Sequence, residues 1–233
     1  MKKILIIVLK FILYFSVIFI LLSISTVIIY KYVAPPITPH MIIRVFEGLI
    51  IGEPVWINKD WVSYDEVSSN FFRAVVGAED ARFMIHNGVD WKAVEASKKY
   101  NERFKGKKKR GASTITMQTA KNTFLPHSRN YVRKAIEVYF TYFIEFFWGK
   151  KRILEVYANI VELGPGLYGV EAASQKFFNK SAINLTKREA ALLASVLPNP
   201  RRWSPDKPTK YINRRVEWIM NRMNSVAIPK KDK

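Results

Sequence analysis

Residues 11–30, FILYFSVIFILLSISTVIIY, contain no charged side chain. About 20 such residues wound as an α-helix extend about 30 Å, the thickness of the hydrocarbon core of a bilayer. A cleaved signal peptide usually has a shorter apolar core followed by small residues, whereas Tyr30, Lys31 and Tyr32 follow this run. The sequence therefore predicts one transmembrane helix that is retained as a signal anchor.

The charges around this helix predict its orientation. Lys2, Lys3 and Lys10 precede the apolar core, whereas Lys31 stands alone after it. The positive-inside rule places the N-terminus in the cytoplasm and the chain after about residue 33 outside. The net charge is +19, of which residues 1–33 supply four lysines and no acid. A chain this basic favours anionic binding partners, such as nucleic acid, lipid headgroups or phosphorylated substrates. Because the chain after the helix is predicted to lie outside the cytoplasm, nucleic acid is the least expected of these partners.

The remainder reads as one mainly α domain. Residues 34–39, with three prolines, predict a stiff linker, and residues 41–62 predict a short strand or an irregular packed segment. The charge run 105–110 predicts a loop. Helices are predicted at 67–82, 90–104, 115–124, 130–148, 150–161, 170–178, from the Thr186–Glu189 capping box to before Pro198, and at 210–226. We therefore divide the chain into an anchor (1–33), a membrane-proximal linker (34–62) and a catalytic domain (63–233).

An acidic pair marks the end of the helix predicted at 67–82. Glu79 follows the apolar Val75 and Val76, and it is either a candidate general base or an ordinary surface carboxylate. Asp80 points to a different face of the helix and is predicted to hold local structure. His86 is predicted to be a hydrogen-bonding residue of a turn. With no second histidine at metal spacing and no cysteine, no zinc site, thiolate site or disulfide is expected.

The segment 111–125, GASTITMQTAKNTFL, is unusually rich in polar groups: Ser113, Thr114, Thr116, Gln118, Lys121 and Asn122. Such residues begin a hydrophilic helix, since Ser and Thr are good N-caps. The interpretation we favour is the hydrogen-bonding wall of a substrate cleft, with Lys121 directed at phosphate.

A second charged group opens the helix predicted at 130–148. Arg133 and Glu137 lie four residues apart and share a face, and Lys134 lies beside them. They form either a surface ion pair or a carboxylate among cations that bind pyrophosphate oxygens.

These segments together resemble the peptidoglycan glycosyltransferases of glycosyltransferase family 51, in particular the monofunctional biosynthetic transglycosylases. The motifs occur in order: EDxxFxxHxGxD at 79–90, GxSTIxxQxxKNxFL at 111–125, RKxxE at 133–137, KRILExYxN at 151–159, GxGxxGxExA from Gly164, and ALLAxxLPNPRRW at 191–203. The resemblance implies a lysozyme-like α fold and an apolar, membrane-dipping region between the anchor and the cleft.

The resemblance also implies the reaction. Lipid II would be polymerised into β-1,4-linked glycan strands with release of undecaprenyl pyrophosphate, by direct inverting displacement. Glu79 would be the general base, and Glu137 would lie on the pyrophosphate side with Lys121, Arg133 and Lys134. No cofactor is required, although a Mg²⁺ or Mn²⁺ ion bridging the pyrophosphate stays open. The implied location is the bacterial inner membrane with a periplasmic catalytic domain, and the implied partners are the glycan strand and other cell-wall synthesis or division proteins.

Two departures and three alternatives accompany this prediction. Met117 replaces the usual first glutamine of a Gln-Gln pair, which puts one cleft amide in doubt, and Ala158 replaces a leucine in what reads as a packing position. A lytic transglycosylase or lysozyme would share the fold class but cleave glycan. A membrane-anchored scaffold would use only the anchor and the basic surface. The Ser-x-x-Lys match at 204–207 has no Lys-Thr-Gly after it, so a transpeptidase is not predicted.

Overall fold

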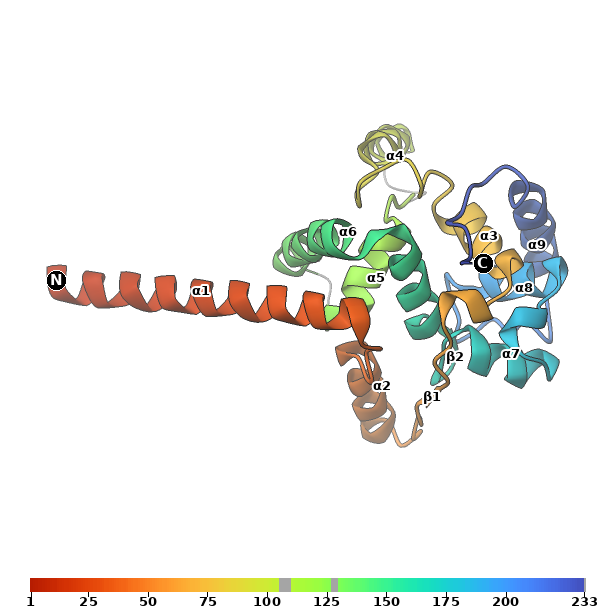
Figure 1. Cartoon of the computed structure of the whole chain (residues 1–233), viewed down its shortest axis with the longest axis horizontal. Coiled ribbons are helices and arrows are strands. Elements are labelled where there is room, and N and C mark those ends of the chain that lie inside the picture. The colour runs from red at the N-terminus through yellow and green to blue at the C-terminus, as the bar shows by residue number, and fades with distance from the viewer. Residues whose placement is uncertain (105–109, 127–129, 233) are drawn as a thin grey trace. The chain divides into compact units, whose positions relative to one another are not determined.

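The computed structural model describes residues 1–104, 110–126 and 130–232. Most of the charge run that predicts a loop, residues 105–109, lies outside this range. The chain forms two compact units, Met1–Ala34 and Pro35–Lys233 (Figure 1). The three functional regions defined from the sequence remain a prediction.

The first unit is the helix α1, Lys2–Tyr32. It is the one helix in the described ranges that is long and apolar enough to cross a membrane. Two of its hydroxyl groups are satisfied within the helix, since Ser16 donates to the Ile12 carbonyl and Thr26 to the Leu22 carbonyl, each at 2.8 Å. Such internal bonds suit hydrocarbon, where no water can bind a polar group.

The second unit begins with a helix that the sequence analysis missed. Residues Pro39–Ile50 form α2, so the strand or irregular segment expected over residues 41–62 is wrong for residues 41–50, whereas the strand β1 does lie in the later part. The Thr38 side chain accepts from the Met41 amide at 3.3 Å, and Pro39 occupies the first helical position. Thr38-Pro39 therefore begins a helix, although the neighbouring prolines made this segment resemble an extended linker.

A small sheet follows, with strand order β1-β3-β2. β1 (Asn58–Lys59) pairs parallel to β3 (Leu167–Tyr168), and β2 (Glu162–Gly164) pairs antiparallel to β3. Gly166 in the intervening turn has φ +70°, and a Cβ there would collide with the Trp56 carbonyl oxygen. The sheet therefore joins segments about 100 residues apart through a turn that requires glycine.

The rest of the unit is helical, as predicted. The helices are α3 (Ser69–Glu79), α4 (Trp91–Arg103), α5 (Ile115–Phe124), α6 (Tyr131–Ile160), α7 (Val170–Phe178), α8 (Lys187–Val196) and α9 (Lys210–Arg222), with short 3₁₀ turns η1 (Tyr64–Glu66) and η2 (Ala182–Asn184). Gly149 interrupts α6 at φ +71°, which confirms the predicted break. The Thr186–Glu189 capping box opens α8, also as predicted.

Two packed groups of helices place the functional residues. α5 lies along α6, while α3 packs against α8 and α9 (Figure 1). Large side chains such as Phe71, Phe72 and Tyr157 are fully buried in this core. The end of α3 and the beginning of α5 come together because Asp80, the residue after α3, accepts a hydrogen bond from the Ile115 amide at 3.0 Å.

Candidate active site

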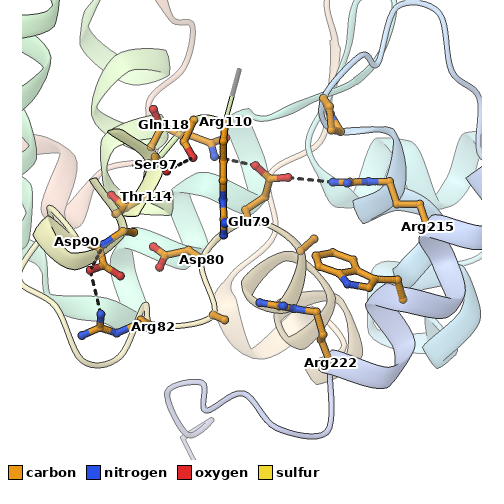
Figure 2. Close-up of a pocket in the computed structure, with 18 residues that line it drawn as sticks. Glu79, Asp80, Arg82, Asp90, Ser97, Arg110, Thr114, Gln118, Arg215 and Arg222 are labelled. Atoms are coloured by element: carbon orange, nitrogen blue, oxygen red, sulfur yellow. Dashed lines mark hydrogen bonds and ion pairs between the residues drawn. The ribbon is translucent and has the colours of Figure 1, made fainter. Parts of the chain in front are cut away.

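A cavity of about 750 Å³ opens where α3 ends, α5 begins and α9 passes (Figure 2). Its wall includes polar residues predicted from the sequence and residues of α9 that were not predicted: Glu79, Ser113, Thr114, Gln118, Arg215 and Trp218. The cavity therefore gathers parts of the chain that lie more than 100 residues apart.

Glu79 is the last residue of α3, and its carboxylate is held from two sides (Figure 2). Gln118 Nε2 donates to Oε2 at 3.0 Å, and Arg215 Nη2 lies 3.4 Å from Oε1. The Glu79 side chain is 19% exposed, so it is fixed yet open to the cavity. A carboxylate held in this way can accept a proton from a hydroxyl that enters the cavity.

Asp80 is buried and structural, as the sequence indicated. Its carboxylate accepts from the Ile115 amide at 3.0 Å and contacts His86 Nε2 at 2.9 Å. His86 is likewise buried, and its Nε2 makes this contact. Within the described residues, no cluster of three or more His, Asp or Glu side chains is arranged to hold a metal ion.

The polar segment at the start of α5 divides between the cavity and the core. Thr114 is the N-cap of α5, and its hydroxyl also donates to the Gly88 carbonyl at 2.5 Å. Ser113 and Gln118 line the cavity with it. Thr116 does not, since it is fully buried and donates to Glu145 at 3.0 Å. The expectation that Thr116 belongs to the cleft wall is therefore wrong: one turn of helix points it into the α5–α6 contact.

The departure at Met117 is also explained by burial. Met117 is only 4% exposed and does not line the cavity, so its side chain packs in the core. Among the residues that the structure describes, Gln118 is the amide side chain that lines the cavity, and Met117 does not line it. Ala158 is fully buried, in keeping with a packing position.

The second charged group surrounds Glu137, which is 3% exposed. Arg133 and Lys134 each donate to its carboxylate at 2.5 Å. Lys121 is half-buried. Burial lowers the pKa of Lys121, and the negative charges of Glu137 and Glu79 partly offset this shift. Lys121 thus lies within electrostatic reach of both glutamates, although neither it nor Glu137 lines the 750 Å³ cavity.

Asn122, also predicted as a site residue, is half-buried and does not line this cavity. The structure therefore places the predicted residues in two neighbouring groups, one around Glu79 and one around Glu137, with Lys121 on α5 influenced by both.

Residues of α9 were missed by sequence reasoning. Arg215 is held by a bond from its Nε to the Ser195 carbonyl at 3.1 Å, which directs the remaining guanidinium towards Glu79. Trp218 and Arg222 lie beside it, with the Arg222 guanidinium 4.5 Å from the Trp218 ring centre. Their spacing of three and four residues was a readable signal of one shared face.

Comparison with known proteins identifies the family. The model of the family described as Transglycosylase matches residues 47–224. The chain belongs to this family. A protein of Bdellovibrio bacteriovorus named biosynthetic peptidoglycan transglycosylase is 52% identical over 208 residues, covering 89% of this chain and 82% of the relative. Proteins with the same name from Rhodospirillum centenum and Bacteroides thetaiotaomicron are 48% and 44% identical, covering 91% and 90% of this chain and 87% and 88% of the relatives.

The family assignment agrees with the helical architecture, so the predicted lysozyme-like fold class is confirmed. Both site groups and α9 lie inside the matched residues. The chain is a peptidoglycan glycosyltransferase.

Proposed function

We propose that this glycosyltransferase polymerises lipid II into β-1,4-linked glycan strands by direct inverting displacement, with Glu79 as the general base. The observation that carries the proposal is the Glu79 carboxylate, held between Gln118 and Arg215 at the wall of a cavity that can admit a sugar. The group around Glu137 contains the cations Arg133 and Lys134, whose positive charge can stabilise a pyrophosphate leaving group.

The proposed step balances without a covalent enzyme intermediate. Glu79 takes the proton from the 4-hydroxyl of the acceptor GlcNAc, and that oxygen forms a bond to the anomeric carbon of the donor MurNAc. The bond from that carbon to the pyrophosphate oxygen breaks, and its electron pair leaves on undecaprenyl pyrophosphate. A single displacement converts the α-linked donor into a β-1,4 linkage.

The leaving group acquires negative charge, and fixed cations stabilise it best in a partly dry site. We assign this role to Lys121, Arg133 and Lys134, and the contacts of Arg133 and Lys134 with Glu137 support it. Both oxygens of Glu137 already accept from cations, so this carboxylate does not fit a divalent ion held by the protein. A Mg²⁺ or Mn²⁺ ion would have to be bound by the substrate, and we assign no step to it.

The membrane location extends the proposal. α1 is a single apolar helix that suits a single-pass anchor, and six residues separate it from α2. α2 exposes Ile42, Phe46, Leu49 and Ile50, which suits contact with lipid. We place the catalytic domain on the periplasmic face of the bacterial inner membrane, with the N-terminus in the cytoplasm and other cell-wall synthesis or division proteins as partners.

Polymerisation of labelled lipid II by the detergent-solubilised chain tests the proposal. Glu79→Gln should lower the rate at least about 100-fold, because it removes a general base. Glu217→Gln, at an exposed position of α9, should leave the rate unchanged. Absence of polymer from the parent chain would refute synthesis. Anhydro-muropeptides released from finished sacculi would instead establish the lytic alternative, and polymerisation by Glu79→Gln at the parent rate would refute the role of Glu79.

A further inference from the structure

The outward face of α9 carries a stripe of aromatic and basic side chains. Its members follow helical spacing and share one face: Tyr211, Arg214, Arg215, Trp218 and Arg222. The stripe extends about 16 Å along the helix axis. A neighbouring face, with Ile212, Val216 and Ile219, is buried in the core. Within the stripe, Tyr211, Arg214 and Trp218 are exposed and can contact a partner.

This stripe continues from the candidate active site. Arg215 and Trp218 line both the cavity at Glu79 and a shallower cavity of about 360 Å³, whose other lining residues are Tyr211 and Arg214. Figure 2 shows Arg215 pointing from α9 towards Glu79, with Arg222 farther along the same helix. A molecule that leaves or enters the Glu79 cavity along α9 would therefore meet the stripe next.

Beyond Tyr211 the same kind of surface persists. The Tyr211 ring lies 5.4 Å from the ring of Trp203, which lines a third cavity of about 560 Å³. Arg201 and Arg202 line that cavity as well. Aromatic rings and arginines therefore line all three cavities, starting at the active site. Together they extend over more than the length of one sugar ring.

The chemistry of the stripe fits a sugar polymer that carries carboxylates. The apolar faces of aromatic rings pack against the C–H faces of sugars, and arginine forms paired hydrogen bonds with carboxylates. A bilayer is a poorer fit, because an interfacial helix inserts its apolar face and the apolar face of α9 is already buried.

We propose that the α9 stripe is a binding track for the peptide-bearing glycan strand, with Tyr211 and Trp218 contacting sugar rings and Arg214 contacting carboxylates of the stem peptides. This inference rests on the proposed function for the identity of the polymer. It extends the contact surface from the Glu79 cavity to Tyr211 and Arg214, which would hold the strand between successive additions.

Binding of three probes to the full chain in detergent tests the track. The probes are uncrosslinked peptide-bearing glycan strands, chitin oligosaccharides, which lack carboxylates, and vesicles containing phosphatidylglycerol. Tyr211→Ala should weaken binding of both glycans about 2- to 5-fold, and Tyr211→Phe should restore it. Arg214→Ala should weaken binding of the peptide-bearing strands by a similar factor but not that of chitin oligosaccharides. Glu217→Ala, on the same helix but outside these cavities, is the control.

Polymerisation separates this inference from the proposed function. With lipid II, the double variant Tyr211→Ala/Arg214→Ala should make shorter strands than the parent chain, since a growing strand would dissociate sooner. Equal strand lengths and glycan affinities for parent and variant would overturn the track even if the parent polymerises lipid II. Loss of vesicle binding alone would assign the stripe to lipid and overturn it as well. If the parent makes no polymer, weakened glycan binding by the variants would still support the track.

Discussion

Removal of the Asp80 carboxylate is the most informative perturbation of this structure. Asp80 is buried next to Glu79, and it connects the end of α3 to His86 and to the first amide of α5. Asp80→Ala leaves the Ile115 amide and His86 Nε2 without this acceptor. Because Gln118, which holds Glu79, lies on α5, a displaced start of α5 should also disturb the candidate base.

The magnitude follows from these two contacts. A hydrogen bond to a charged group contributes about 1.5–3 kcal/mol, so losing two costs about 3–6 kcal/mol of unfolding free energy. For a domain of this size each kcal/mol changes Tm by about 2–4 °C, which predicts a fall in Tm of about 6–24 °C. Asp80→Asn keeps the shape and one acceptor oxygen, and it should cost about 1–3 kcal/mol.

Thermal unfolding of the full chain in detergent, followed by circular dichroism, measures this effect. The control is Asp232→Ala, which removes another ion-paired aspartate whose side chain is 84% exposed. An exposed pair contributes about 0–1 kcal/mol, so its Tm should change by less than about 4 °C. Equal Tm values for Asp80→Ala and the parent would refute our view that Asp80 joins α3 to α5.

Three further predictions concern pH and packing. Burial lowers the pKa of Lys121, so kcat/KM should begin to fall with rising pH below the ordinary lysine pKa of 10.5, because the charge of Lys121 is lost. Lys121→Arg should move this fall to higher pH, because arginine keeps its charge. A variant with the same alkaline fall as the parent would contradict the role of Lys121. Gly88 has φ +84°, and a Cβ there would lie 2.8 Å from Thr141 Cγ2. Gly88→Ala should therefore lower the free energy of unfolding, measured with denaturant, by about 2–4 kcal/mol. An unchanged denaturation midpoint would show that the turn accommodates the methyl group. Met117→Gln would bury an amide and should destabilise by about 1–3 kcal/mol without raising the polymerisation rate; a faster enzyme would show that this side chain does reach substrate.

Elements with strong local signals were predicted closely. α5 and α7 begin and end at the predicted residues, and Asp90 is the N-cap of α4 as expected. Capping side chains, glycine breaks and apolar spacing act within a few residues, so the sequence itself records them. α2 was missed because the prolines at 35, 36 and 39 suggest an extended linker, although Thr38-Pro39 also begins a helix.

By itself the sequence determined an apolar N-terminal helix, a mainly helical domain and the residue types of two charged groups, because these depend on composition and short spacing. Only the tertiary structure decided which of those side chains share a cavity. Arg215 approaches Glu79 from 136 residues away because α9 packs on α3, and Thr116 turns from the cleft because α5 packs on α6. Such contacts depend on how buried faces fit together, which no local pattern records.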